Sequence, residues 1–301
     1  MPWLEYDDAL VQEFLKVLES RAPARRQKEQ VVQDFLEQHT ELVPTPNLLN
    51  HHLALNSIIS KFRLSTSLIT DYIYLTKSSG LWKITFVELE TPDKAIFTAD
   101  MRRATATAAF NNALDQVVDW KTYLDEHKNE ILERLRPLIV PIGMRENPVT
   151  FEYQLIIGRS DNKNRSPKRL KYLEHIRQGL GIEVYSYDTL LGFYTHGQRY
   201  RKNVMRAEGD RFAFKYMLPY VPHIFAHVGP ADLSLTTEQG AELIKRGYEI
   251  EKWKSGEFLT VNGKLAASSD RPFGISPLGR PKLAAMPPDV GEDGETEPTA
   301  S

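Results

Sequence analysis

One predicted hairpin constrains the fold of this chain more than any other feature. Residues 71–90, DYIYLTKSSGLWKITFVELE, hold two runs rich in β-branched and aromatic residues, separated by the turn signal KSSG. This pattern is typical of two antiparallel strands. Side chains along a strand alternate between the two faces, so Glu88 and Glu90 share one face. The same face carries the apolar residues Trp82, Ile84 and Phe86, which indicates that it is covered.

The register of the hairpin decides whether a third acid joins these two. If the loop has an even length, with residue 76 paired to 81 and 77 to 80, Asp71 lies opposite Phe86 and diagonal to Glu88. Cross-strand neighbours of this kind are roughly 5–8 Å apart. An odd-length loop would instead turn Asp71 to the other face.

Asp71 and Glu88 would then form a pair of carboxylates on adjacent strands. Hard divalent cations prefer such oxygen ligands and keep open positions for water and phosphate. Backbone carbonyls near Leu89 would add a ligand. The alternative is a solvated sheet edge that simply carries acids. Because acids on a covered face need a partner or a metal, we expect a metal site here.

The rest of the pattern predicts helices packed on a sheet. Residues 3–19 and 27–39 have apolar positions at helical spacing, and two prolines follow the second helix. Residues 98–124 are predicted to form one long helix with Thr98 or Asp100 as its cap. Strand and helix signals alternate after it. We therefore expect the α/β (α+β) class, with a mixed β-sheet flanked by helices.

Composition divides the chain into four predicted parts. Residues 1–26 form an N-terminal helix and linker, and residues 27–195 hold the sheet with its helices. Residues 196–271 form a smaller C-terminal α+β accessory region. Residues 272–301 are dominated by Pro, Gly, Ala, Glu and Asp with few apolar anchors, which predicts a disordered tail.

Composition also excludes several functions. The chain has no cysteine, which rules out disulfides, zinc–thiolate sites and thiol nucleophiles. Its formal net charge of -2 means that a polyanionic partner would need a local basic patch. Phosphate-loop and GxSxG motifs are absent. Because no signal-peptide pattern and no run of about 18 apolar residues occur, we expect a cytoplasmic protein with no membrane partner.

Several blocks of the sequence resemble a known family. An aspartate on one strand, a hairpin, and a hydrophobic-Glu-Leu run followed by a proline are similar to the core of PD-(D/E)xK nucleases, which have the restriction-endonuclease-like fold. More specifically, the sequence resembles the Shedu family of bacterial anti-phage nucleases over about residues 27–195. The blocks that carry this resemblance are, in order, FLEQHTELV, DYIYLTKSSGLWKITFVELETPDKAIF, ALDQVVDWKTYL, YQLIIGRSD and IEVYSYDTLL.

The resemblance implies metal-dependent phosphodiester hydrolysis of DNA. Asp71 and Glu88 would match the two metal-binding acids, with Mg²⁺ or Mn²⁺ as cofactor. Gln116 would match a glutamine on the long helix that faces the active site, and a buried glutamine held by core hydrogen bonds is the alternative. Since the family assembles, a homo-oligomer is expected in addition to DNA as a partner.

The sequence departs from the family at Glu90, where such nucleases usually carry a lysine. A lysine there stabilises the charge that develops on phosphate and helps to orient the attacking water. A further carboxylate adds like charge instead and raises carboxylate pKa values. Three outcomes stay open. Glu90 is a further metal ligand or base; a basic residue supplies the positive charge, with Lys94, Arg102 and Arg103 as the candidates; or the site is degenerate.

Other residues are candidates for supporting roles. Lys94, Arg102 and Arg103 would contact DNA phosphates, as would the basic strip RYRKNVMR at residues 199–206, and a solvated surface is the alternative for each. Glu29 or Glu37 would add an acid from the helix before the sheet. The alternative function is a catalytically silent module that binds nucleic acid or a partner, and a structural protein is the third hypothesis.

Overall fold

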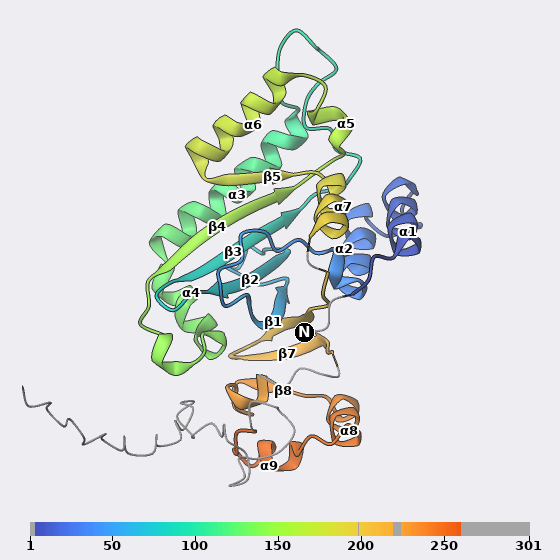
Figure 1. Cartoon of the computed structure of the whole chain (residues 1–301). Helices are drawn as coiled ribbons and strands as arrows, with labels where there is room; N and C mark the ends of the chain where they lie inside the picture. Colours follow the sequence, from blue (N-terminus) through green and yellow to red (C-terminus); the bar gives the residue numbers. More distant parts are fainter. Residues whose placement is uncertain (1–3, 198, 219–223, 260–301) are drawn as a thin grey trace, which may run out of the picture.

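A mixed eight-stranded sheet forms the centre of the protein in a computed structural model, which describes residues 4–197, 199–218 and 224–259 (Figure 1). The strand order is β5-β4-β3-β2-β1-β6-β7-β8. Neighbours β1, β2 and β3 pair antiparallel, whereas β3, β4 and β5 pair parallel. The strands are β1 (Leu53–Ser60), β2 (Tyr72–Lys77), β3 (Trp82–Leu89), β4 (Val149–Ile156), β5 (Ile182–Tyr185), β6 (Asn203–Glu208), β7 (Arg211–Tyr216) and β8 (Leu233–Ser234).

Helices flank this sheet, which confirms the predicted fold class. Helices α3 and α4 cover one face, and α1, α2 and α7 cover the other (Figure 1). The helices are α1 (Asp8–Glu19), α2 (Lys28–Gln38), α3 (Ala108–Glu126), α4 (Lys128–Leu135), α5 (Ser160–Lys163), α6 (Pro167–Leu180), α7 (Tyr187–His196), α8 (Thr237–Lys245) and α9 (Ile250–Lys254). No helix in these described parts is both long and apolar enough to cross a bilayer.

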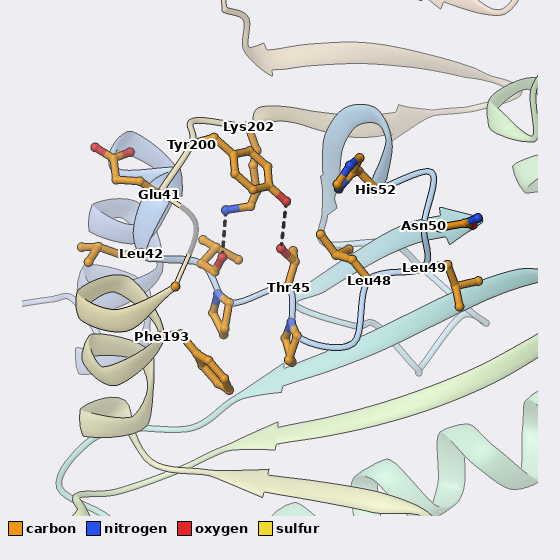
Figure 2. Close-up of a pocket in the computed structure, with 14 residues that line it drawn as sticks. Glu41, Leu42, Thr45, Leu48, Leu49, Asn50, His52, Phe193, Tyr200 and Lys202 are labelled. Atoms are coloured by element: carbon orange, nitrogen blue, oxygen red, sulfur yellow. Dashed lines mark hydrogen bonds between the residues drawn. The ribbon is translucent and has the colours of Figure 1, made fainter. Parts of the chain in front are cut away.

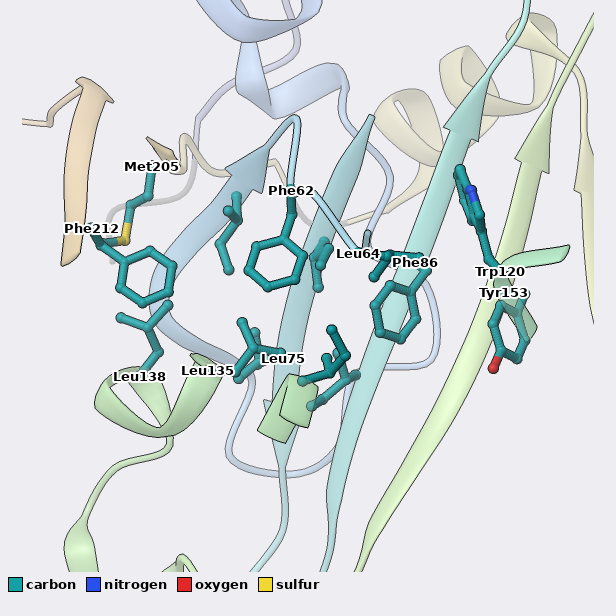
Figure 3. Packing of buried hydrophobic residues seen from close by; sticks show 14 of the residues in the cluster. Phe62, Leu64, Leu75, Phe86, Trp120, Leu135, Leu138, Tyr153, Met205 and Phe212 are labelled. Atoms are coloured by element: carbon teal, nitrogen blue, oxygen red, sulfur yellow. The ribbon is translucent and has the colours of Figure 1, made fainter. Parts of the chain in front are cut away.

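Strand alternation divides the core into two layers. Phe86 and Leu75 face α3 and α4, where Trp120 and Leu135 belong to the same buried cluster (Figure 3). The intervening residues of β3, such as Val87, belong to the second cluster under α1, α2 and α7. The two clusters confirm the predicted separation of the two faces of β3. Glu88 therefore points toward the α3 side of the sheet.

The β2–β3 hairpin has the predicted parity but a different register. Ile73 pairs with Phe86 and Lys77 with Trp82, around a four-residue loop whose Ser78 N–H donates to the Leu81 carbonyl at 2.9 Å. The predicted pairing of 76 with 81 is therefore wrong by two residues. A shift of two keeps every side chain on its face. The observed register places Asp71 opposite Glu88 rather than diagonal to it.

The long helix begins ten residues later than predicted. Helix α3 starts at Ala108, and its cap is Thr107, whose Oγ1 accepts from the Phe110 N–H at 3.1 Å. Thr98 and Asp100 are therefore not its caps. Residues 97–106, which we call the finger, form a narrow loop closed by an antiparallel bridge between Phe97 and Ala106. Tertiary contacts, which a sequence pattern does not show, keep residues 97–106 from forming the first turns of the helix.

The predicted accessory region continues the same sheet. Strand β6 pairs parallel with β1, and β7 pairs with β6, so residues after 196 extend the sheet beyond β1. Helices α8 and α9 follow, and Trp253 packs with Phe225 at a ring-centroid distance of 5.2 Å. The tail predicted at 272–301 lies outside the described residues.

Candidate functional site

Three neighbouring strands bring Lys61, Asp71 and Glu88 side by side. The β1–β2 register pairs Ser60 with Tyr72, and the backbone N–H of Lys61 donates to the Asp71 carbonyl at 2.9 Å. On the other side, the Asp71 N–H donates to the Val87 carbonyl at 3.1 Å. The three residues therefore lie in a row across the sheet, with Glu88 facing Gln116 of α3 and Lys61 near Glu29 of α2.

Hydrogen bonds fix both acids of the predicted pair. Asp71 accepts from the Lys61 Nζ at Oδ1 and from the Leu89 N–H at Oδ2, the latter at 2.6 Å. Glu88 Oε1 accepts from Gln116 Nε2 at 2.6 Å. Asp71 and Glu88 are only 3% and 7% exposed, so each needs these partners. The structure thus places Gln116 of α3 against Glu88 of the acid pair, on the side that the resemblance implies.

Glu90 lies beside this pair but has its own cation. Its carboxylate accepts from Lys94 Nζ at 2.5 Å, four residues further along the chain across a turn. Its backbone carbonyl accepts from the Tyr187 hydroxyl at 2.6 Å, which ties the end of β3 to α7. Lys94 therefore neutralises Glu90 rather than standing free toward solvent.

The structure distinguishes the two further acids that the sequence left open. Glu29, in the first turn of α2, lies 3.9 Å from Lys61 Nζ. Glu37 is directed elsewhere, because it binds Ser60 Oγ and forms an ion pair with Lys215. Of these two residues of α2, Glu29 is thus the one that lies next to Lys61 and joins the site. We use the term acid cluster for Glu29, Asp71, Glu88 and Glu90 together with Lys61 and Lys94.

The electrostatics of the acid cluster disfavour full ionisation. Burial raises the pKa of Glu88 to about 10, and the charges of Asp71, Glu29 and Glu90 add to this effect. Burial also raises the pKa of Asp71, while Lys61 and the Leu89 N–H oppose the rise. The same causes, burial first and then Asp71, raise the pKa of Glu29. Glu88 therefore holds a proton at neutral pH when no cation replaces it.

Lys61 is the residue of this site that sequence reasoning missed. Burial works to lower its pKa, but the attraction of Asp71 and Glu29 outweighs burial and raises it, so Lys61 stays charged. Its backbone has φ +49°, a left-handed conformation that is strained for a lysine. No sequence signal reports that conformation. The register of β1 on β2, had it been derived, would have placed Lys61 opposite Asp71.

The acid cluster has features that suit a divalent cation. In residues 4–197, 199–218 and 224–259, no three His, Asp or Glu side chains are arranged together as a ready ligand set. The pair of Asp71 and Glu88 nevertheless offers two carboxylates within hydrogen-bonding reach of each other. A cation that is held by one or two carboxylates and keeps its waters is the usual form of Mg²⁺ binding. It would take the place of the proton on Glu88.

The other basic candidates lie outside the acid cluster. Arg102 and Arg103 are exposed at the tip of the finger. In the basic strip, Arg199 donates to the Tyr194 carbonyl at 3.1 Å and Lys202 is buried. Arg201 pairs with the buried Glu41 at 3.3 Å, so these three of the four cations in the strip make contacts within the fold.

Two hollows on the surface are alternative candidate sites. One of about 360 Å³ lies beside residues 41–50, and no residue of the acid cluster lines it (Figure 2). Lys202 lines it, but its Nζ donates to the carbonyls of Thr40 and Val43 at 2.7 and 3.0 Å. The other, of about 540 Å³, opens next to Gln116 and is lined by Asp115 and Asp119. These acids disfavour a phosphate backbone there.

Together, these features define a mixed α/β protein whose central sheet carries buried carboxylates beside two lysines. The family model described as "Shedu protein SduA, C-terminal" matches residues 26–191, more than half of the chain. The chain therefore belongs to the Shedu family, and this membership points to a role in anti-phage defence. No curated protein matches the chain.

Proposed function

We propose that this protein is a metal-dependent DNA endonuclease and that the acid cluster is its active site. The observation that carries the proposal is the row of Lys61, directly after β1, Asp71, directly before β2, and Glu88 of β3. Two buried acids with an adjacent lysine are the groups that phosphodiester hydrolysis needs. In this proposal α2, β1, β2, β3, α3 and β4 form a core similar to that of the PD-(D/E)xK nucleases.

Asp71 and Glu88 would hold Mg²⁺ or Mn²⁺. Bound there, the cation would polarise a phosphate oxygen and lower the pKa of a bound water. Gln116 holds Glu88 in place through its 2.6 Å hydrogen bond, and the Leu89 N–H does the same for Asp71. The two carboxylates are thereby oriented before any substrate arrives, which is the condition for electrostatic catalysis.

Lys61 would provide the positive charge that Glu90 cannot. Its Nζ contacts Asp71, and its side chain is 49% exposed, so it can reach both the metal site and a phosphate in solvent. Lys94 is less suited, because its Nζ already neutralises Glu90. Of the three outcomes for Glu90, the contacts thus favour a basic residue from elsewhere, with Lys61 in place of the candidates expected from sequence.

Cleavage assays test this proposal. Linear and single-stranded DNA would be incubated with the protein, with and without Mg²⁺ or Mn²⁺. We expect metal-dependent cutting that Asp71→Ala abolishes. Lys61→Met should lose cutting, Lys61→Arg should retain part of it, and Lys245→Met, at an exposed position of α8 outside the acid cluster, should cut like the unchanged protein. Cutting that Asp71→Ala leaves intact would refute the proposed site.

A catalytically silent nucleic-acid-binding module is the second candidate function. The observation that favours it is Glu90 itself, which stands where a lysine is expected and adds a negative charge beside Glu88. It predicts metal-independent DNA binding without cutting. Cutting that begins only in Glu90→Lys would support this second function, because it would show a site inactivated by that one residue.

A further inference from the structure

The finger, residues 97–106, is a rigid projection rather than a loose loop. Its two arms pair like the strands of a ribbon, with the Thr98 N–H donating to the Thr105 carbonyl at 2.9 Å. The side-chain amide of Asn162, in α5, hydrogen-bonds to the backbone of one arm as a neighbouring strand would. Its Nδ2 donates to the Phe97 carbonyl at 3.0 Å, and its Oδ1 accepts from the Phe97 N–H at 2.8 Å.

A buried arginine clamps the finger at its base. Arg169 of α6 is 0% exposed and donates to the Thr98 carbonyl at 2.7 Å and to the Asp100 carbonyl at 3.3 Å. Its guanidinium also lies over the Phe97 ring, 5.1 Å from the centroid. Lys168 Nζ reaches the tip and donates to the Arg102 carbonyl at 3.1 Å. The backbone of the finger is therefore fixed before any partner binds, which lowers the entropy cost of binding.

The tip of the finger presents one apolar side chain and two arginines to solvent. Met101 is 46% exposed, and the Arg102 side chain is 92% exposed. Apart from Phe97 at the base, the rest of the two arms carries short side chains, namely Thr98, Ala99, Asp100, Ala104, Thr105 and Ala106, so the projection stays narrow. A fixed backbone with long, exposed side chains at its end is suited to reach into a recess of a partner.

The surface around the tip is positively charged. Five exposed cations gather on the finger and on the adjoining α5–α6 segment, namely Arg102, Arg103, Arg165, Lys168 and Lys171. Two carboxylates oppose them, since Asp100 lies 3.4 Å from Arg102 and Asp161 lies 3.0 Å from Arg165. The excess of positive charge is local, as the net charge of the chain is -2. It is complementary to a nucleic-acid backbone and not to the acid-lined hollow beside Gln116.

We propose that the finger enters the major groove of double-stranded DNA, with Met101 against base edges and Arg102 and Arg103 on the phosphates of the groove walls. The proposal rests on the proposed function in taking DNA as the partner. The major groove admits a two-stranded ribbon, whereas the minor groove is about half as wide. Met101 would contact apolar groups such as the thymine methyl, and the cations of α6 would bind the adjacent backbone.

Binding without cutting separates this proposal from the nuclease proposal. Fluorescence anisotropy with a labelled duplex would be measured in Ca²⁺, with Asp71→Asn in every protein so that no strand is cleaved. Arg102→Ala with Arg103→Ala should weaken binding about 10-fold or more and make the slope of log K against log salt shallower by about 2. Arg211→Ala with Arg246→Ala, which removes the same charge from exposed sites elsewhere, is the matched control. Met101→Ala should weaken binding roughly 5-fold without changing the slope.

Modified DNA tests the choice of groove. Duplex with glucosylated 5-hydroxymethylcytosine, whose sugars fill the major groove, should bind more weakly, and netropsin, which fills the minor groove, should not compete. The proposal is overturned if the finger variants bind like the control pair, if single-stranded DNA shows the same losses, or if netropsin competes. Finger variants that bind DNA normally but lose self-association would assign the finger to a protein partner and also overturn it. None of these results depends on whether the protein cuts DNA.

Discussion

Glu88→Gln should make the metal-free protein more stable at neutral pH, although it removes a charged residue from the proposed active site. The glutamine amide resembles a protonated Glu88, since its oxygen accepts from Gln116 and its NH₂ donates toward Asp71. The pKa of Glu88 is raised from 4.5 to about 10 in the folded state. Between these two values the folded chain binds one more proton than the unfolded chain, so the free energy of unfolding falls as pH rises.

The size of the effect follows from the two pKa values. Each pKa unit corresponds to about 1.4 kcal/mol, so moving from pH 5 to pH 7.5 costs the wild-type fold up to about 3 kcal/mol through Glu88 alone. The free energy of unfolding of Glu88→Gln should not fall in this way as the pH rises. Other groups titrate in the same range, but they are common to both proteins and cancel when the two pH dependences are subtracted.

Urea unfolding at pH 5 and pH 7.5 in the presence of EDTA measures this difference. Glu152→Gln is the control, because it removes a carboxylate from β4 that is 36% exposed and pairs with Lys83 at 3.0 Å. Millimolar Mg²⁺ should raise the stability of the wild type at pH 7.5, with release of protons, and leave Glu88→Gln almost unchanged. A pH dependence of Glu88→Gln within about 0.5 kcal/mol of the wild type would refute the raised pKa.

Two further predictions concern stability and are checked by the same unfolding measurements. Gly158→Ala should destabilise the fold by about 2 kcal/mol or more, because φ is +66° and an added Cβ would lie 2.3 Å from the Lys94 carbonyl oxygen. Gly179→Ala, in α6 with open space around it, should stabilise the fold by up to about 1 kcal/mol. Equal effects of the two substitutions would contradict this reasoning. Lys215→Met should cost roughly 2–4 kcal/mol by leaving the buried Glu37 without its cation, and adding Glu37→Gln should recover most of that loss. A double variant no better than Lys215→Met would show that the ion pair is not the cause.

The faces of the sheet were predictable from sequence, and the reason is the period of two. The predicted register of the hairpin was wrong by two residues, yet Asp71, Glu88 and Phe86 still lie on the predicted face. The position of Gln116 near the acids came from the family resemblance, because the sequence alone allowed a buried glutamine held by core hydrogen bonds equally well. Periodicity thus determines which side of the sheet a residue faces, whereas the geometry of the turn determines which residue it pairs with.

The finger and Lys61 were not predictable, for different physical reasons. Residues 98–107 contain several alanines and threonines that suit a helix at least as well as a loop, but contacts from Asn162 and Arg169, more than sixty residues away, hold them in the finger. Tertiary contacts override such weak propensity. The position of the Lys61 side chain depends on a left-handed backbone conformation at the end of β1. A lysine in the sequence does not predict that conformation.

The most direct test of the central claim is to locate Mn²⁺ in crystals of the protein by anomalous diffraction. The proposed function predicts an anomalous peak between the carboxylates of Asp71 and Glu88, lost in Asp71→Asn, with Lys61 moved away from Asp71 Oδ1. Mn²⁺ bound elsewhere in a protein that cuts DNA would contradict the assignment of the active site. An empty acid cluster at saturating Mn²⁺ would contradict metal binding by these residues altogether.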